Sequence, residues 1–302
     1  MEANRGLKNY ARFASSTASK FKVSNPEGRN SWNRYAQNPG DEGSPNFHDD
    51  RKQMHESIRN GIVDIVQPVP EGEQPIAIMF GGGPASGKSS LLESGDLVLP
   101  GQIVKVDSDH IKSLLPDYDE LIKDADQSLS QRAASFVHEE SSFVSKQVLG
   151  SALGTRRHTL LDGTGNGSLD SIERKSRQMR AAGHKVVAQY VTVDTDEAVR
   201  RSNARAAKTG RFVPESVIRG THEKVSAVMP QAITEGLFDE WNLWDTGKGG
   251  KPVQVASGKG SSGTVHDREA WHSFLKKAGE KTFEQYKDLF SESAPETVAD
   301  LA

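Results

Sequence analysis

The sequence predicts an α/β fold with a mainly parallel, doubly wound sheet, and two observations lead to that prediction. Apolar runs of strand length begin near Pro75, Gln102, His158 and His184, and they alternate with stretches of helical character. The first run leads directly into a glycine-rich loop, GGGPASGKSS, at residues 81–90. Alternation of strands and helices along a chain is what a doubly wound parallel sheet requires.

The glycine-rich loop has the spacing of a phosphate-binding loop, G-x-x-x-x-G-K-S/T. Its backbone N–H groups converge on phosphate oxygens, its lysine amine reaches the β- and γ-phosphates, and its serine hydroxyl can bind Mg²⁺. A strand precedes the loop and a helix N-terminus, which attracts anions, follows it; a glycine-rich turn that binds nothing is the alternative. We therefore expect ATP or GTP and Mg²⁺ as cofactors, with Ser89 as a metal ligand. The residues expected to bind the nucleotide are Gly82, Gly83, Pro84, Ala85, Ser86, Gly87, Lys88, Ser89 and Ser90.

Composition limits the classes of protein to consider. A chain of 302 residues with 34% hydrophobic residues fits one P-loop core with helical extensions at both ends. The net charge of −3 argues against a general nucleic-acid or membrane-surface binder, and the lack of cysteine excludes disulfides and thiolate metal sites. No apolar run approaches the roughly 18 residues of a membrane span, and the N-terminus lacks the apolar core of a signal peptide. A cytoplasmic protein is expected.

Four segments are predicted along the chain. Residues 1–50 form a flexible arm, 51–75 an amphipathic helix with its connector, 76–257 the P-loop core, and 258–302 a linker with a C-terminal helix. Within the core, Trp241–Asp245 is expected to be an edge strand.

The amphipathic helix is predicted from the recurrence of Met54, Ile58, Ile62 and Ile65 at spacings of four, four and three residues. These residues share one face of a helix that ends near Pro68. The helix covers the flank of the core, or it acts as an intramolecular lid or as an attachment point for a regulatory partner.

Two acids follow the second strand, whose run from Gln102 ends at Asp107 and is followed closely by Asp109. Ligands of open parallel sheets gather at the carboxyl ends of the strands, so both acids are expected near the phosphate loop. Either one can accept a proton from a substrate hydroxyl or help to hold Mg²⁺, with Asp107 as the favoured metal ligand. A solvated turn is the alternative.

Further candidates for substrate contact lie beyond these acids. Glu139 follows a histidine, but the second histidine four residues on that a zinc helix requires is lacking, so a substrate contact or a solvated helix face is expected. The third strand ends at Asp162, which can organise Mg²⁺ or accept hydrogen bonds from substrate hydroxyls. Thr164 lies in the glycine-rich stretch 163–167, where a ligand can approach the backbone.

Arginines concentrate after the fourth strand. Arg201 and Arg205 are four residues apart and share a helix face, whereas Arg211 follows Gly210 in a loop that Pro214 closes. Phosphoryl transfer needs cations near the moving group, and arginine supplies them in a planar, bidentate form. A solvated basic helix is the alternative for the arginines of the helix, and a functional role is favoured for Arg211.

Taken as a set, five stretches resemble the zeta-toxin family of P-loop kinases. They are GGGPASGKSS, then VDSDHIK at 106–112, PDYDEL at 116–121, LDGTG at 161–165 and TGRFVP at 209–214. Only the first is specific alone, and the resemblance covers about residues 75–257. It implies an ATP-binding core that phosphorylates the sugar 3′-hydroxyl of UDP-N-acetylglucosamine and that a small helical antitoxin holds in check.

By position, the resemblance implies that Lys88 is the phosphate-loop lysine, Asp109 the catalytic base and Arg211 a phosphate-contacting arginine. Arg205 or Arg201 supplies the second arginine, with Arg201 also a candidate for substrate contact. Asp162 falls where members of the family commonly carry a glutamate that contacts the sugar. Which of Asp107, Asp109 and Asp162 serves as base, metal ligand or substrate contact stays open.

The predicted function is thus that of a kinase that transfers the γ-phosphoryl group of ATP or GTP to a hydroxyl of a nucleotide sugar. Its partners are the acceptor and an antitoxin, unless residues 1–66 inhibit the site in cis. Two other functions are considered. A polynucleotide or nucleoside kinase would need a stacking platform, for which Trp32 and Tyr35 in the basic arm are the candidates. The second is a nucleotide-gated interaction protein without turnover.

Overall fold

The computed structural model describes residues 30–38, 46–124, 133–163, 165, 167–209, 213–247 and 251–292. These residues belong to two compact units that interleave along the chain. The first unit takes its residues from Met1–Ala77, Leu99–Asp162 and Ala182–His184, and the second from Ile78–Val98, Gly163–Ala181 and Lys185–Ala302. The four segments proposed from the sequence therefore stay a prediction.

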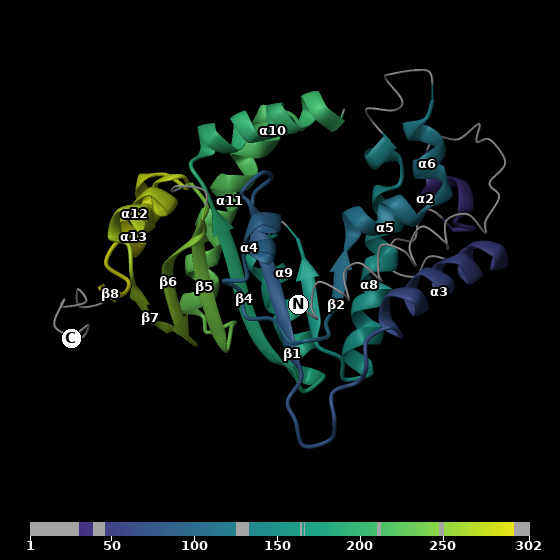
Figure 1. Ribbon diagram of the computed structural model, residues 1–302, viewed down its shortest axis with the longest axis horizontal. Helices are drawn as coiled ribbons and strands as arrows, with labels where there is room; N and C mark the ends of the chain where they lie inside the picture. The colour runs from purple at the N-terminus through teal and green to yellow at the C-terminus, as the bar shows by residue number, and fades with distance from the viewer. Residues whose placement is uncertain are drawn as a thin grey trace. The chain divides into compact units, whose positions relative to one another are not determined.

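The first unit is largely helical around a parallel pair of strands. β2 and β3 pair in parallel with Asp107 opposite Asp162, so two of the predicted strands end in neighbouring acids. α8 packs against α3 and α5, and Figure 1 shows the three helices next to one another. Its elements are α2 (Ser31–Tyr35), α3 (Asp49–Val63), β2 (Val104–Asp107), α5 (Ser108–Leu114), α6 (Pro116–Ile122), α8 (His138–Gly154) and β3 (Thr159–Asp162).

The predicted amphipathic helix is present as α3, with one change at its end. Met54, Ile58 and Ile62 are almost completely buried, as their spacing predicts. Ile65, by contrast, is 42% exposed, because the helix ends at Val63 and the chain leaves the shared face before reaching it. Val66 is buried instead.

Part of the predicted flexible arm is folded. Trp32, Ala36 and Phe47 form a small buried cluster, and Tyr35 and Phe143 pack against it. Trp32 meets Phe47 edge to face at 5.3 Å between ring centroids. These contacts come from a single helical turn and an isolated bridge from Ala36 to Phe47, elements too short to show a hydrophobic period in the sequence. The rest of the arm lies outside the described residues.

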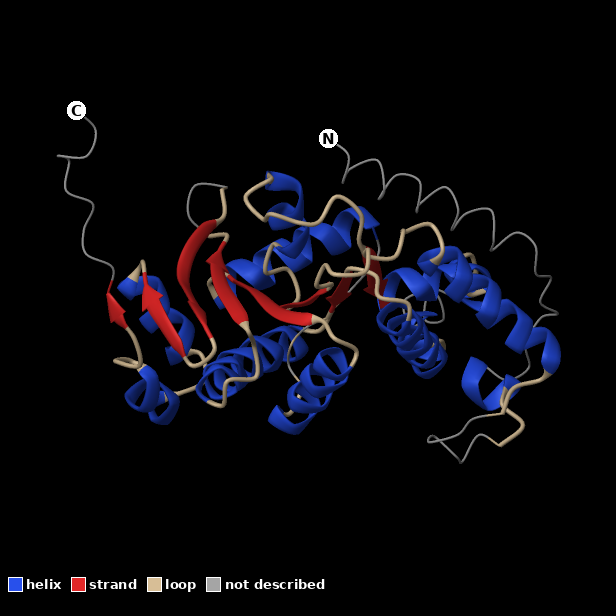
Figure 2. Cartoon of the chain, turned by 90° about the horizontal axis from the view of Figure 1, so that it is seen from below, coloured by secondary structure: helices blue, strands red, loops and turns tan. Residues whose placement is uncertain are grey.

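The second unit contains the larger part of the sheet. Its strands follow the order β1-β4-β5-β6-β7-β8, with β4 parallel to β5, β6 antiparallel to both β5 and β7, and β8 parallel to β7. In Figure 2 the strands of this unit form a row of red arrows that leads toward the C-terminus. Its elements are β1 (Ile76–Gly82), which begins in the first unit, α4 (Lys88–Ser94), α9 (Leu169–Ala181), β4 (Lys185–Thr192), α10 (Thr195–Thr209), α11 (Glu215–Thr234), β5 (Glu240–Asp245), β6 (Val253–Lys259), β7 (Ser262–Val265), α12 (Arg268–Lys276), α13 (Glu280–Tyr286) and β8 (Ser291–Glu292).

The C-terminal part departs from the sequence-based expectations in three ways. β5 is not an edge strand, because it lies between β4 and β6, and its Trp241 is fully buried. The expected Gly/Ser linker at 258–264 is the tight β6–β7 hairpin, whose turn is Gly260-Ser261. The expected single helix is divided into α12 and α13, with Gly279 at φ 89° between them. Small residues there serve a hairpin turn and a helix break, which composition alone does not distinguish from a linker.

The predicted fold class, an α/β P-loop kinase core with a mainly parallel, doubly wound sheet and helical extensions, is confirmed. Four of the strands predicted in the core are present as β1, β2, β3 and β4. In the described part of the chain, every helix is too short or too polar to cross a membrane.

Candidate functional site

The phosphate loop connects β1 to α4 in the second unit. Its first glycines and Ser86 are buried, whereas Ser89 and Ser90 are exposed in the first turn of α4. Ala85 and Gly87 adopt left-handed backbone angles, with φ of 57° and 90°. Alternating right- and left-handed residues turn successive N–H groups toward one concave side, which is the backbone form of an anion-binding nest. The Nζ of Lys88 donates to the Gly82 carbonyl at 3.0 Å, so the lysine side chain folds back over the loop.

A histidine that the sequence analysis did not identify supports this loop from α11. His222 Nε2 lies 3.0 Å from the carbonyl oxygen of Pro84, and a Cβ at Gly83 would approach the imidazole to 2.3 Å. Burial lowers the pKa of His222 to about 4. The ring is therefore neutral at pH 7, and its Nε2–H donates to the carbonyl. This contact explains why Gly83 must lack a side chain.

Thr246, which follows β5, holds the other side of the loop. Its hydroxyl donates to the Ser86 carbonyl at 2.7 Å. A Cβ at Gly87 would lie 2.6 Å from the Thr246 hydroxyl oxygen. The threonine is 5% exposed. The sequence holds no signal for this residue, because the contact joins positions 160 residues apart.

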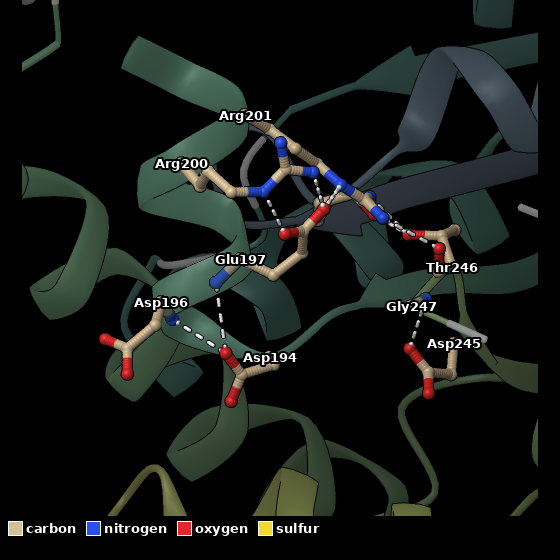
Figure 3. Close-up of polar contacts among 9 residues, drawn as sticks. Asp194, Asp196, Glu197, Arg200, Arg201, Asp245, Thr246 and Gly247 are labelled. Atoms are coloured by element: carbon tan, nitrogen blue, oxygen red, sulfur yellow. Dashed lines mark hydrogen bonds and ion pairs between the residues drawn. The ribbon is translucent and has the colours of Figure 1, made fainter. Parts of the chain in front are cut away.

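The guanidinium of Arg201 on α10 makes hydrogen bonds to other residues of the same chain. It donates to Thr246 Oγ1 at 3.0 Å, to the Thr246 carbonyl at 2.9 Å and to Glu197 Oε1 at 2.7 Å. Figure 3 shows the guanidinium of Arg201 between these two residues. Hydrogen bonds from Arg200 and Arg201 lower the pKa of Glu197 to about 2. Arg205 lies one turn further along the same helix, and the predicted Arg211 lies outside the described residues.

A partly buried lysine lies at the carboxyl end of β4. Lys277, directly after α12, donates from Nζ to the Thr192 hydroxyl at 2.6 Å and to the Val193 carbonyl. Burial lowers its pKa to about 8, although Asp245 and Asp194 act in the opposite direction. The C-terminal extension thus supplies a partly buried lysine to this end of β4.

In the first unit, two of the three predicted acids share one lysine. Lys105 Nζ lies 3.0 Å from Asp107 Oδ2 and 3.1 Å from Asp162 Oδ2. Burial alone would lower the pKa of Lys105, but the two carboxylates outweigh it and the pKa is raised. Asp107 also caps α5, since its Oδ1 accepts the N–H groups of Asp109 and His110 at 3.0 and 3.2 Å. Asp107 therefore has a structural role that its sequence position did not reveal.

Asp109 has a different environment. It lies in the first turn of α5, its side chain is 48% exposed, and Oδ1 accepts from Lys112 Nζ at 2.9 Å. Glu139 is exposed at the start of α8 and accepts from Asn30 Nδ2 at 3.3 Å. Thr164 lies outside the described residues. Of the three acids, Asp109 is the most accessible to a ligand, because the side chains of Asp107 and Asp162 are 21% and 14% exposed.

A buried ionic network, which the sequence analysis also did not find, joins α3 to α6 and α8. Arg51 donates from Nε to Glu140 Oε1 and from Nη2 to Asp117 Oδ2, each at 2.6 Å. His55 Nε2 lies 2.7 Å from Glu140 Oε1, and the Tyr35 hydroxyl donates to Asp117 Oδ1 at 3.0 Å. Burial alone would raise the pKa of Glu140, but the hydrogen bonds from His55 and Arg51 lower it to about 2.

Within the described ranges, no group of three or more histidine, aspartate or glutamate side chains is arranged to hold a metal ion.

Comparison with known sequences finds a match to one family. The family model described as Zeta toxin matches residues 60–243. A curated relative, Toxin zeta of Streptococcus pyogenes, is 33% identical over 78 residues, which are 26% of this chain and 26% of that protein. The aligned stretch thus spans about a quarter of the length of the curated relative.

Solved structures share the fold. A chain from the PezAT chromosomal toxin–antitoxin system of Streptococcus pneumoniae aligns with a TM-score of 0.54 at 14% identity, covering 66% of this chain and 78% of that one. A chain from the AvrRxo1-ORF1:AvrRxo1-ORF2 complex with sulphate ions aligns at 0.62 and 18% identity, covering 92% and 88%. The same complex with ATP gives 0.60 at 17% identity, covering 92% and 88%.

Proposed function

The chain belongs to the zeta toxin family, and on that premise we propose that it is a kinase that transfers the γ-phosphoryl group of ATP or GTP to a hydroxyl of a nucleotide sugar. The favoured acceptor is the 3′-hydroxyl of UDP-N-acetylglucosamine, which follows from the family resemblance. One observation carries the kinase assignment. The phosphate loop joins a strand to a helix, and its backbone is held by His222 on Pro84 and by Thr246 on Ser86.

In the proposed donor site the loop N–H groups and Lys88 bind the phosphates. Gly87 precedes α4, whose N-terminus favours the anion, and Ser89 and Ser90 are exposed in its first turn. The exposed hydroxyl of Ser89 fits a magnesium ligand, because it directly follows the cradle. A bound magnesium ion would neutralise part of the phosphate charge. Asp107 already caps α5 and pairs with Lys105, so we assign the metal to Ser89 alone.

The proposed reaction is an in-line displacement. The acceptor hydroxyl oxygen forms a bond to the γ-phosphorus while the bond from that phosphorus to the β,γ-bridging oxygen breaks, and the nucleoside diphosphate leaves. The hydroxyl proton passes to the carboxylate of Asp109, whose partly exposed side chain supports the role of base. Arg205 and Arg211 offset the charge that develops on the moving group. Asp162, Thr164 and Glu139 contact the acceptor.

The proposed partner is a small helical antitoxin, with cis-inhibition by residues 1–66 as the alternative. Two of the structurally similar proteins support a partner of this kind, one from a toxin–antitoxin system and one from a two-protein complex. Because the proposed substrates are ATP and a nucleotide sugar, we propose a cytoplasmic location for the activity.

The test is a transfer assay with purified protein, radiolabelled ATP, Mg²⁺ and a panel of acceptors: UDP-N-acetylglucosamine, other nucleotide sugars, nucleosides and oligonucleotides. Lys88→Ala should abolish transfer, whereas Lys224→Ala, an exposed lysine of α11, should not. Asp109→Asn should keep nucleotide binding and lose roughly 100- to 10,000-fold in kcat, with Asp119→Asn, an exposed acid of α6, as its control.

Each outcome of the panel has a meaning. Transfer to UDP-N-acetylglucosamine supports the proposal in full. Transfer only to a nucleoside or an oligonucleotide would replace the acceptor with that of a nucleoside or polynucleotide kinase. Nucleotide binding with no transfer to any acceptor would overturn the kinase in favour of a nucleotide-gated interaction protein.

A further inference from the structure

We propose that Thr246 is a positioning residue of the phosphate loop, and that its hydroxyl transmits the orientation of Arg201 on α10 to the Ser86–Gly87 peptide. The inference rests on the proposed function only in so far as the loop binds a nucleotide, and it is independent of the acceptor. It assigns roles to Thr246 and Arg201 that the motifs of the chain do not contain.

The direction of the hydrogen bonds in this chain of contacts is fixed by chemistry. A guanidinium can only donate, and a backbone carbonyl can only accept. The Thr246 hydroxyl, which lies 3.0 Å from Arg201 Nη1 and 2.7 Å from the Ser86 carbonyl, must therefore accept from the arginine and donate to the carbonyl. A charged donor polarises the hydroxyl and strengthens the second bond.

The Ser86 carbonyl is a sensitive point of the loop. A trans peptide is planar, with its C=O and the following N–H pointing in opposite directions. When Thr246 holds the carbonyl of Ser86, the N–H of Gly87 is directed away from Thr246. Gly87 is the N-cap of α4 and one of the residues whose N–H group is expected to face phosphate. The hydroxyl of Thr246 thus sets the orientation of a ligand-binding donor that it does not touch.

Arg201 is itself held in place. Its Nε donates to Glu197 Oε1 one turn back on α10, and its Nη2 donates to the carbonyl of Thr246, so both ends of the guanidinium are fixed. Asp194 caps the start of α10 by accepting from Glu197 N at 3.0 Å, as Figure 3 shows. We therefore assign Arg201 to loop positioning and leave the phosphate-contacting role on α10 to Arg205.

The test compares Thr246→Val, which keeps the shape and removes the hydroxyl, with Thr246→Ser, which keeps the hydroxyl. Binding of ADP with Mg²⁺ is measured by isothermal titration calorimetry, without an acceptor. We expect Thr246→Val to weaken binding by about 10- to 100-fold, because the Ser86 carbonyl and the Nη1 group of Arg201 lose the hydroxyl that they share. Thr246→Ser should stay within about threefold. Thr234→Val is the matched control, since Thr234 is exposed and its hydroxyl donates to the Pro230 carbonyl within α11 at 2.9 Å.

A double-mutant cycle tests the connection to α10. Arg201→Met should weaken ADP binding, and the double variant with Thr246→Val should be weaker by less than the product of the two single effects. The melting temperature of each ligand-free variant separates positioning from general stability.

The inference is overturned if Thr246→Val binds ADP as the wild type does, or if it lowers only the melting temperature. It is also overturned if Thr246→Ser is as weak as Thr246→Val, or if the two single effects multiply. A wild type that binds ADP but transfers phosphate to no acceptor would refute the proposed kinase and leave the inference intact, whereas a wild type that binds no nucleotide would refute both.

Discussion

Replacing Glu140 by Gln should destabilise the protein by about 3 kcal/mol at pH 7. The carboxylate is completely buried in α8 and accepts hydrogen bonds from Arg51 at 2.6 and 2.9 Å and from His55 at 2.7 Å. Glutamine keeps the shape but removes the charge, and its amide group must face one of these donors. Arg51 then stays buried with Asp117 as its remaining charged partner. Breaking a buried pair in this way costs about 3 to 5 kcal/mol.

The lowered pKa of Glu140, which has the same contacts as its cause, leads to a similar magnitude. The folded protein lowers it from 4.5 to about 2. Each pH unit of difference between the folded and unfolded pKa is worth about 1.4 kcal/mol, so the carboxylate contributes about 3 kcal/mol. Because the folded pKa is the lower one, this contribution is complete above pH 4.5 and is lost as the pH falls through 2. About 1 kcal/mol is lost by pH 4 and about 2 kcal/mol by pH 3.

The assay is urea unfolding of the wild type and Glu140→Gln at pH 7, 5, 4 and 3, followed by far-ultraviolet circular dichroism. The difference in unfolding free energy should be constant between pH 7 and 5 and should narrow below pH 4.5. Glu139→Gln, an exposed neighbour on the same helix, is the matched control and should be close to wild type. A loss below about 1 kcal/mol at pH 7, or a difference that does not narrow with acid, would refute the role given to the buried network.

Three further predictions concern the site. Folding lowers the pKa of His222 from 6.5 to about 4. The neutral ring therefore contributes up to about 3 kcal/mol to the unfolding free energy above pH 6.5, and this contribution is lost as the pH falls through 4. Thermal melts at pH 7, 6, 5 and 4 should show this loss in the wild type and a smaller loss in His222→Asn. Lys112→Met should lower kcat about 10- to 100-fold without changing the Kd for ADP, because Asp109 loses the ammonium at 2.9 Å that orients it; stopped-time transfer assays check this, and recovery in Lys112→Arg is required. Gly87→Ala should abolish measurable ADP binding, because the new Cβ would lie 2.6 Å from the Thr246 hydroxyl at a backbone φ of 90°; calorimetry that shows wild-type affinity would contradict the packing described.

The part of the site that could be predicted from the sequence is the part whose residues are adjacent in the chain. The glycine spacing identifies the phosphate loop, and an apolar run that ends in an acid identifies β2 and β3. The residues that hydrogen-bond to the loop from outside could not be predicted, because His222 and Thr246 are 138 and 160 residues away from their partners in the chain. Neither residue belongs to a motif, and only the fold brings them to Pro84 and Ser86.

In the fold, too, the elements with a repeating local pattern could be predicted and the others could not. Periodicity predicts α3 from Met54 onward, since a long amphipathic helix repeats its pattern. The aromatic cluster around Trp32 and Phe47 has no repeat to detect, because it is made by one helical turn and one bridge. In the C-terminal part, glycine and serine mark the β6–β7 turn rather than a linker, and nothing in the local composition separates the two.

The anchoring of α3 limits how this protein can be regulated. To act as a removable cover, α3 would have to withdraw Arg51 and His55 from Glu140 and leave a carboxylate in an apolar interior. A cost of about 3 kcal/mol leaves only roughly one molecule in a hundred in the released state at equilibrium. A regulator that exchanges quickly would therefore have to act while α3 stays docked on α8.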